Sequence, residues 1–215
     1  MKPESRYLGA MPLDYVEVVV MKDAFQPLSS EAQWHSLLNE AQAKSHRQLS
    51  EMLEHYLVVL LMRFTRRAES LCQAVAPGYL EAMTAEGQQR PRELRDVGDT
   101  CLLLAGLFPG RANALAVKSD YYIGLGQSAY GEASTHLDTE DHPLFLTLAQ
   151  RFVSAMDVLM AIRLLNESTT MLPDALTAHD LHRTYGSRSA HSALSHHCEQ
   201  ESCVIVSPSS SGTLH

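Results

Sequence analysis

Long hydrophobic runs are missing from this sequence of 215 residues. The longest apolar stretches are 56–62 (YLVVLLM) and 101–108 (CLLLAGLF), well short of the roughly 20 residues that span a bilayer. The N-terminal segment contains Glu4 and Asp14 and lacks the apolar centre of a secretory signal. These absences predict a cytoplasmic protein without a membrane partner.

Cysteine and basic residues are also scarce. Four cysteines do not make a disulfide framework in a chain of this length. Cys72 and Cys101 fall within apolar helical patterns, so we expect both to be buried, reduced core residues. The 17 Lys and Arg residues against 25 Asp and Glu residues give a net charge of −8. Such an acidic chain disfavours nucleic acid as a partner, except at a local patch.

Helical periodicity is the strongest pattern that is present. Between residues 49 and 64, apolar side chains recur at spacings of three, four and seven, as on one face of a helix. Similar patterns cover 30–41, 94–108, 111–137 and a segment from Pro143 to about residue 160. Shorter helices are expected around 69–76, where Pro77 and Gly78 interrupt the pattern, and around 173–182. The sequence therefore predicts an all-α protein, a single bundle of five to seven helices.

Three glycines lie within the helical pattern of 111–137, at Gly124, Gly126 and Gly131. Each costs up to about 1 kcal/mol of helix propensity relative to alanine. We expect a neighbouring helix to approach closely at these positions, which would compensate for that cost.

The chain divides into three predicted parts. Residues 1–29 form an N-terminal arm, in which 13–21 fits either a strand, because it is rich in β-branched residues, or a short helix begun by Asp14 and Glu17. Residues 30–183 form the helical bundle. Residues 184–215 are rich in serine and histidine and poor in large apolar residues, which predicts a disordered tail.

Glutamate and histidine recur together at helical spacing, which suggests a metal site. Three Glu-x-x-x-His pairs place both side chains on one helix face. The pairs are Glu31 with His35, Glu51 with His55, and Glu132 with His136. Helix bundles build di-iron sites from inward-facing carboxylates and histidines, so Glu51, His55, Glu132 and His136 are candidate ligands. The alternative is a solvated helix face with incidental histidines.

The tail offers a second set of metal-ligating side chains. His196, His197, Cys198 and Cys203 lie close together in the sequence. Imidazole and thiolate are good ligands for zinc, nickel or copper, although this spacing is not that of a standard structural zinc site.

Arginines cluster near two predicted helix ends. Arg63, Arg66 and Arg67 end one helix, and Arg92 and Arg95 begin another. Together they would form a patch that binds an anion or an acidic partner if the two ends are neighbours. The alternative is that these arginines pair with the nearby Asp96 and Asp99.

Four segments carry a resemblance to known proteins. They are 57–67 (LVVLLMRFTRR), 94–112 (LRDVGDTCLLLAGLFPGRA), 120–133 (DYYIGLGQSAYGEA) and 152–159 (FVSAMDVL). In these strings the chain resembles a group of uncharacterised all-helical bacterial proteins, over roughly residues 45–165. The resemblance implies a bacterial, cytoplasmic setting and no particular activity, because none is established for the group.

The patterns favour a non-enzymatic protein-interaction or regulatory module, because no set of catalytic residues stands out. We expect a protein partner, and a homodimer would cover the excess apolar surface. No cofactor is expected beyond a metal ion. The competing hypothesis is a metal-dependent helical oxidoreductase of the di-iron or manganese type that uses the Glu/His pairs.

Overall fold

The computed structural model of this chain describes residues 31–66, 75–108, 119–136, 141–165 and 173–204. In these ranges the protein is all-α, as predicted, and has nine helices and no strand. The helices are α2 (Glu31–Ser45), α3 (Glu51–Arg66), α4 (Val75–Thr84), α5 (Gln89–Leu107), α7 (Ser119–Thr135), α8 (His142–Gln150), α9 (Phe152–Leu165), α10 (Ala175–Tyr185) and α11 (Arg188–Val204). The predicted number of five to seven was too low. The N-terminal arm and Cys72 lie outside the described residues.

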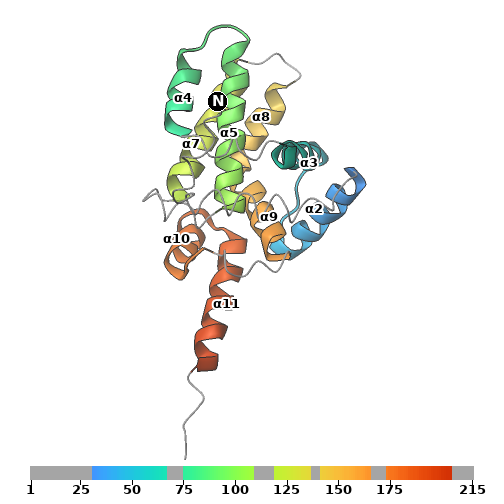
Figure 1. The fold of residues 1–215 in the computed structure, drawn as a ribbon, viewed down its shortest axis with the longest axis vertical. Coiled ribbons are helices and arrows are strands. Elements are labelled where there is room, and N and C mark those ends of the chain that lie inside the picture. Colours follow the sequence, from blue (N-terminus) through green and yellow to red (C-terminus); the bar gives the residue numbers. More distant parts are fainter. Residues whose placement is uncertain (1–30, 67–74, 109–118, 137–140, 166–172, 205–215) are drawn as a thin grey trace, which may run out of the picture.

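Two helices form the centre of the protein. α5 packs against α4, α7 and α9, and α9 also packs against α2 and α11 (Figure 1). Nearly every residue in the second half of α5 and in 155–163 of α9 is buried. A helix that is apolar on all sides has no face for water, so the other helices surround these two.

Close helix packing explains one of the three glycines in α7. A Cβ atom at Gly126 would lie 2.5 Å from the ring of Phe152 and 2.9 Å from Cβ of Cys101. Cys101 is a buried free thiol, as expected, and burial raises its pKa to about 12. The expectation of close packing is wrong for Gly124 and Gly131, because no neighbouring atom lies within 4 Å of a Cβ atom there.

Pro77 and Gly78 do not interrupt a helix, contrary to the prediction. They lie near the start of α4, which runs on to Thr84. Proline is tolerated in the first turn of a helix, because the amide N–H that it lacks would have no intrahelical acceptor there. Residues 69–74 of the predicted helix lie outside the described ranges.

The helix predicted to begin at Pro143 is two helices. Pro143 does stand in the first turn of α8, but α8 ends at Gln150 and α9 begins at Phe152. The two helices are bent by 72° at this break. In the described part of the chain, no single helix is long and apolar enough to cross a membrane, and only this bent pair reaches the required length and composition.

The C-terminal region is more ordered than predicted. Disorder was expected from residue 184, yet α11 covers Arg188–Val204. Its first turn is fixed by Ser187 and Ser189, whose hydroxyls donate to Asp157 of α9, and its Ala190 and Ala193 are buried. The small side chains of α11 allow this helix to pack closely although it buries little apolar area. The composition of the segment did not indicate such packing. Residues 205–215 lie outside the described ranges.

α2 ends at a residue in the left-handed conformation. His46 has a φ of 51°, in the region that favours glycine. The N–H of Arg47 donates to the carbonyl of Gln42 (3.1 Å) and the N–H of His46 donates to the carbonyl of Ala43 (3.2 Å). This pair of bonds is a Schellman motif, which reverses the chain after a helix.

The connecting segment 46–50 then returns along α2. The N–H of Leu49 donates to the Gln42 side chain of α2 (2.8 Å). Five extended residues span up to about 17 Å, and ten residues of helix rise about 15 Å. The contacts of Glu54 with Gln42 and His35 place the first turn of α3 beside the middle of α2 instead of at its end.

Asp157 of α9 binds both the segment 46–50 and the turn before α11. Its carboxylate is fully buried and lies 2.7 Å from Nη2 of Arg47. It also accepts the hydroxyl of Ser187 (2.5 Å) and the N–H of Arg188 (3.0 Å). Arg47 donates in addition to the carbonyl of Gly186 (2.9 Å). The segment 46–50, α9 and the turn before α11 are thereby joined.

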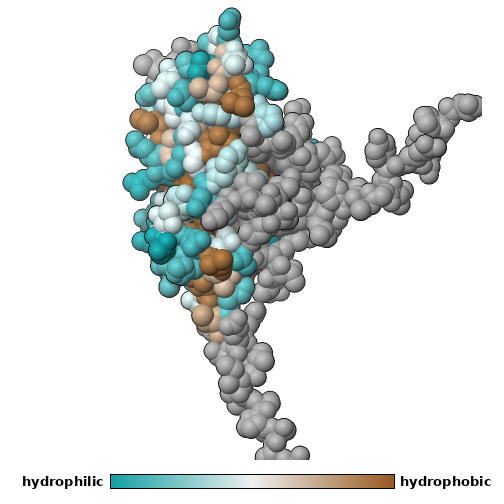
Figure 2. Space-filling model, turned by 90° about the vertical axis from the view of Figure 1, so that its left-hand side faces the viewer, coloured by the Kyte–Doolittle hydropathy of each residue, from teal (hydrophilic) through white to brown (hydrophobic). Residues whose placement is uncertain are grey.

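Among the described residues, most large apolar side chains are buried. Figure 2 shows one face of the protein, on which the coloured hydrophobic residues form separate patches among hydrophilic ones. The most exposed large apolar side chains are Leu80 of α4 and Leu176 of α10.

Candidate metal centre

A carboxylate and two imidazoles meet where α2 and α3 cross. Oε1 of Glu31 lies 3.8 Å from Nε2 of His35 and 3.7 Å from Nδ1 of His55. One potential ligand atom from each of the three residues lies within 4.8 Å of the others. Within the described ranges, this is the single group of three or more acidic, histidine or cysteine side chains that meets this condition.

A second carboxylate orients His35. Nδ1 of His35 lies 2.9 Å from Oε1 of Glu54, which as a carboxylate can only accept a hydrogen bond. The Nδ1 atom therefore carries the proton, and in the neutral ring Nε2, which lies 3.8 Å from Oε1 of Glu31, is the nitrogen that can bind a metal ion. Gln42 donates to the other oxygen of Glu54 (3.3 Å) and accepts the N–H of Leu49 (2.8 Å).

This donor set suits a divalent transition metal ion. Zinc binds imidazole nitrogen and carboxylate oxygen at about 2.0–2.2 Å, which separates tetrahedral ligand atoms by about 3.4 Å. The two observed separations from Glu31 are 3.7 and 3.8 Å, and the two histidine nitrogens lie within 4.8 Å of each other, so side-chain movement must bring the ligand atoms closer to bind an ion. The side chains of Glu31 and His55 are 58% and 62% exposed, so at least one coordination position would face solvent. When the histidines are protonated, the same groups form ion pairs.

Comparison of the chain with protein-family models, curated proteins and solved structures finds no match. Function is therefore inferred from the chemistry of this cluster.

The cluster uses only part of the predicted metal ligands. His55 belongs to it, but its carboxylate neighbour is Glu31 of the other helix and not Glu51, which is exposed. Glu132 lies in the last turn of α7 and His136 directly follows this helix, and both are outside the cluster. Glu132 lies 3.9 Å from Nη2 of Arg90.

The predicted ligands of the tail lie on α11. His196 and Cys198 are exposed. His197 is half-buried, and its Nε2 lies 3.0 Å from the carbonyl oxygen of Pro173. The side chain of Cys203 lies outside those that the structure describes.

The predicted arginine patch is partly neutralised by aspartates. Arg63 of α3 lies 3.1 Å from Asp96 and 3.3 Å from Asp99 of α5, and Arg95 lies 3.9 Å from both. Arg66 and Arg92 are exposed, and Arg67 lies outside the described residues. The two helices do bring Arg63 and Arg95 together, but around carboxylates of the same chain.

Asp99 is the centre of a buried polar cluster. Its Oδ1 accepts the hydroxyls of Tyr56 (2.5 Å) and Tyr130 (2.8 Å), while Oδ2 faces Arg63 and Arg95. Burial raises the pKa of the Asp99 carboxyl, although the tyrosine hydrogen bonds and the arginine charges oppose this effect. The pKa values of both tyrosine hydroxyls are raised by burial and by the neighbouring aspartate. The cluster joins α3, α5 and α7.

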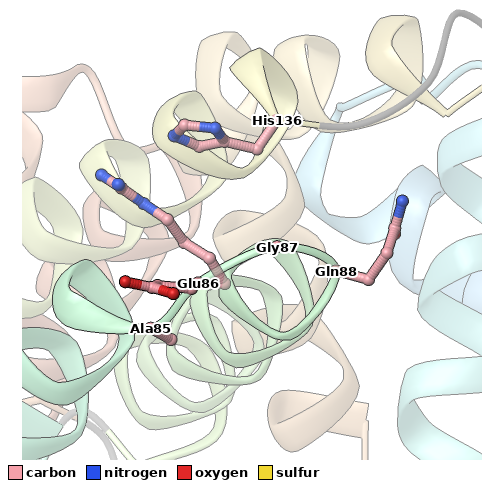
Figure 3. A pocket seen from close by; sticks show the side chains of 6 residues that line it. Ala85, Glu86, Gly87, Gln88 and His136 are labelled. Carbon is pink, nitrogen blue, oxygen red and sulfur yellow. The ribbon is translucent and has the colours of Figure 1, made fainter.

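A shallow hollow of about 500 Å³ lies between the α4–α5 turn and the end of α7. Figure 3 shows His136 across the hollow from Glu86 and Gly87. Arg90 also lines it, beside Glu132. The hollow presents groups of both charges, so it does not select a ligand of one sign.

Sequence reasoning missed Glu54 and Gln42. Helical periodicity shows which face of a helix is apolar but not which polar residue meets a neighbouring helix. The pairing of Glu31 with His55 depends on the return of segment 46–50 along α2. The sequence does show that the connection between α2 and α3 is short. It does not show in which direction the connection runs.

Proposed function

We propose that this protein is a metal-regulated helical module that binds one divalent transition metal ion through Glu31, His35 and His55. The observation that supports this most directly is the convergence of the three ligand groups while Glu54 orients one of them. An ion held by both helices would fix α2 against α3. The ion would thus cross-link α2 and α3.

The exposure of the ligand side chains argues for regulation in place of catalysis, whereas an open coordination position by itself is shared with catalytic zinc sites. Two of the three ligands are more than half exposed, so water would reach the metal freely. Enzymes commonly exclude water around a reacting metal-bound group. Protein partners, a homodimer and a bacterial cytoplasmic setting, expected from the sequence, belong to the same proposal.

The metal-dependent oxidoreductase is the second candidate. It shares His55 as a ligand but requires Glu51 and further carboxylates around two ions. About two iron or manganese ions per purified chain, lost on Glu51→Ala, would favour it over the single-ion module.

Titration of the purified, untagged protein with Zn²⁺ or Co²⁺ tests the proposal. We expect one saturable ion per chain, with affinity at least ten-fold weaker in His35→Ala and in His55→Ala, because each removes a ligand. The bound ion should also stabilise the fold, by about 2.7 kcal/mol at a free metal concentration 100 times the dissociation constant.

Two controls isolate this site. Glu51→Ala lies on the same turn of α3 as His55 and should bind the ion as the wild type does. A triple variant of His196, His197 and Cys198 to alanine removes the described ligands of the predicted tail site and should retain the stoichiometric ion. Stoichiometric binding that survives His35→Ala, or that disappears in the triple variant, contradicts the assignment.

A further inference from the structure

We propose that Glu54 is a positioning residue of the metal site and that, through Gln42, it couples metal binding to the order of segment 46–50. This inference rests on the proposed function, since it concerns how the same site is held and what its occupancy changes.

The role of Glu54 follows from the two ring nitrogens of His35. Only a nitrogen without a proton can bind a metal ion, and Nε2 is the one that faces Glu31. A carboxylate that accepts the Nδ1 proton keeps the ring in this tautomer and increases the basicity of Nε2. Glu54 does this at 2.9 Å, and its side chain is only 21% exposed, so solvent competes weakly for the bond.

Gln42 extends the contact to the backbone of the connecting segment. Its side-chain oxygen must face the N–H of Leu49 (2.8 Å), which leaves its amide nitrogen for the second oxygen of Glu54 (3.3 Å). A continuous series of hydrogen bonds thus runs from His35 through Glu54 and Gln42 to Leu49. An ion that fixes His35 restricts each member of the series.

The consequence reaches beyond the two helices. Segment 46–50 carries Arg47, which binds Asp157 of α9 and the carbonyl of Gly186 before α11. Metal binding is therefore expected to protect the backbone of a segment that holds the C-terminal helices in place.

The affinity for Zn²⁺ tests the positioning role. Glu54→Gln keeps an acceptor for Nδ1 but loses the charge, and Glu54→Ala loses both. We expect Zn²⁺ binding weakened by about 10-fold to 100-fold in Glu54→Ala and by a smaller factor in Glu54→Gln. Glu51→Gln, a loss of the same charge one turn away and outside the cluster, is the matched control and should bind as the wild type does. Urea unfolding without metal checks that the variants fold, so that a loss of affinity at unchanged stability reports positioning and not unfolding.

Hydrogen exchange at the Leu49 amide tests the coupling. In the wild type, Zn²⁺ should slow this exchange several-fold, and in Gln42→Ala the exchange should be fast with or without the ion. If the wild type binds Zn²⁺ and Glu54→Ala binds it equally well, the positioning role is wrong while the metal site stands. Unchanged Leu49 exchange in the zinc-loaded wild type overturns the coupling. A wild type that binds no Zn²⁺ overturns the proposed function, and this inference with it.

Discussion

At the scale of single residues, Asp99 shows how this protein keeps a carboxylate inside its core. Burial disfavours the charged form, and two tyrosine hydroxyls and two arginines compensate for part of that cost. Because these partners come from α3, α5 and α7, the aspartate also fixes how the helices pack. Removing one partner would leave a buried polar group unsatisfied, which costs roughly 1–3 kcal/mol.

The raised pKa of Asp99 predicts a pH dependence of stability. The folded protein binds the Asp99 proton more tightly than the unfolded chain does, so unfolding releases a proton between the two pKa values. This contribution to stability is complete below the ordinary aspartate pKa of about 3.9 and is lost as the pH rises through the folded value. Asp99→Asn cannot titrate and lacks this dependence.

Urea unfolding of the wild type and Asp99→Asn from about pH 4 upward measures the effect. The wild-type free energy of unfolding minus that of the variant should decrease as the pH rises, because other carboxyl groups cancel in the difference. A difference that is constant or increases with pH contradicts the pKa direction.

At the scale of one helix, α7 contains one glycine that close packing requires and two glycines that close packing does not require. Gly126 faces Phe152 and Cys101, whereas Gly124 and Gly131 have open space where a Cβ atom would lie. The same residue type therefore has opposite consequences along one helix.

Alanine substitutions in α7 should change stability in opposite directions. Gly126→Ala forces a methyl group against the Phe152 ring and should lower the free energy of unfolding by about 1–3 kcal/mol. Gly124→Ala, two residues away, gains helix propensity without a clash and should raise it by about 0.5–1 kcal/mol. Urea unfolding at one pH compares the two, and equal effects of either sign would contradict the packing seen at Gly126.

At the scale of the whole molecule, Asp157 joins parts of the chain that lie far apart in sequence. Arg47 precedes it by 110 residues and Ser187 follows it by 30. Both side chains meet its buried carboxylate in α9, so the segment between α2 and α3 and the turn between α10 and α11 share one ion-paired group.

Removal of this carboxylate should destabilise the protein strongly. Asp157→Ala leaves the Arg47 charge and the Arg188 N–H without their acceptor, and loss of one partner of a buried pair costs about 3–5 kcal/mol. Asp180→Ala, at a half-exposed position of α10, should change stability by less than about 0.5 kcal/mol. A loss of similar size in both variants would show that Asp157 has no special role.

Much of this architecture was accessible from the sequence. The apolar repeats of 49–64 and 94–108 and the proline at position 143 are local signals, and each marks a helix that the structure contains. The signals failed where distant packing overrides local preference. α11 is held at its start by Asp157 of α9, which lies 30 residues before Ser187, and the break between α8 and α9 falls at Arg151 within a continuing apolar repeat.

The sequence by itself determined that this chain is helical and which stretches form its apolar core. Helical periodicity depends only on residues three and four positions apart, so it can be recognised without the tertiary structure. It also supplied glutamates and histidines at one-turn spacing. One of these pairs, Glu31 with His35, meets in the structure as the spacing predicts. Only the tertiary structure decided that His55 also meets Glu31 and that His35 meets Glu54. The left-handed turn at His46 and the return of segment 46–50 bring Glu54 and His55 beside His35 and Glu31. The direction of this connection depends on how α2 packs against α9 and how α3 packs against α8. No local sequence pattern encodes this packing.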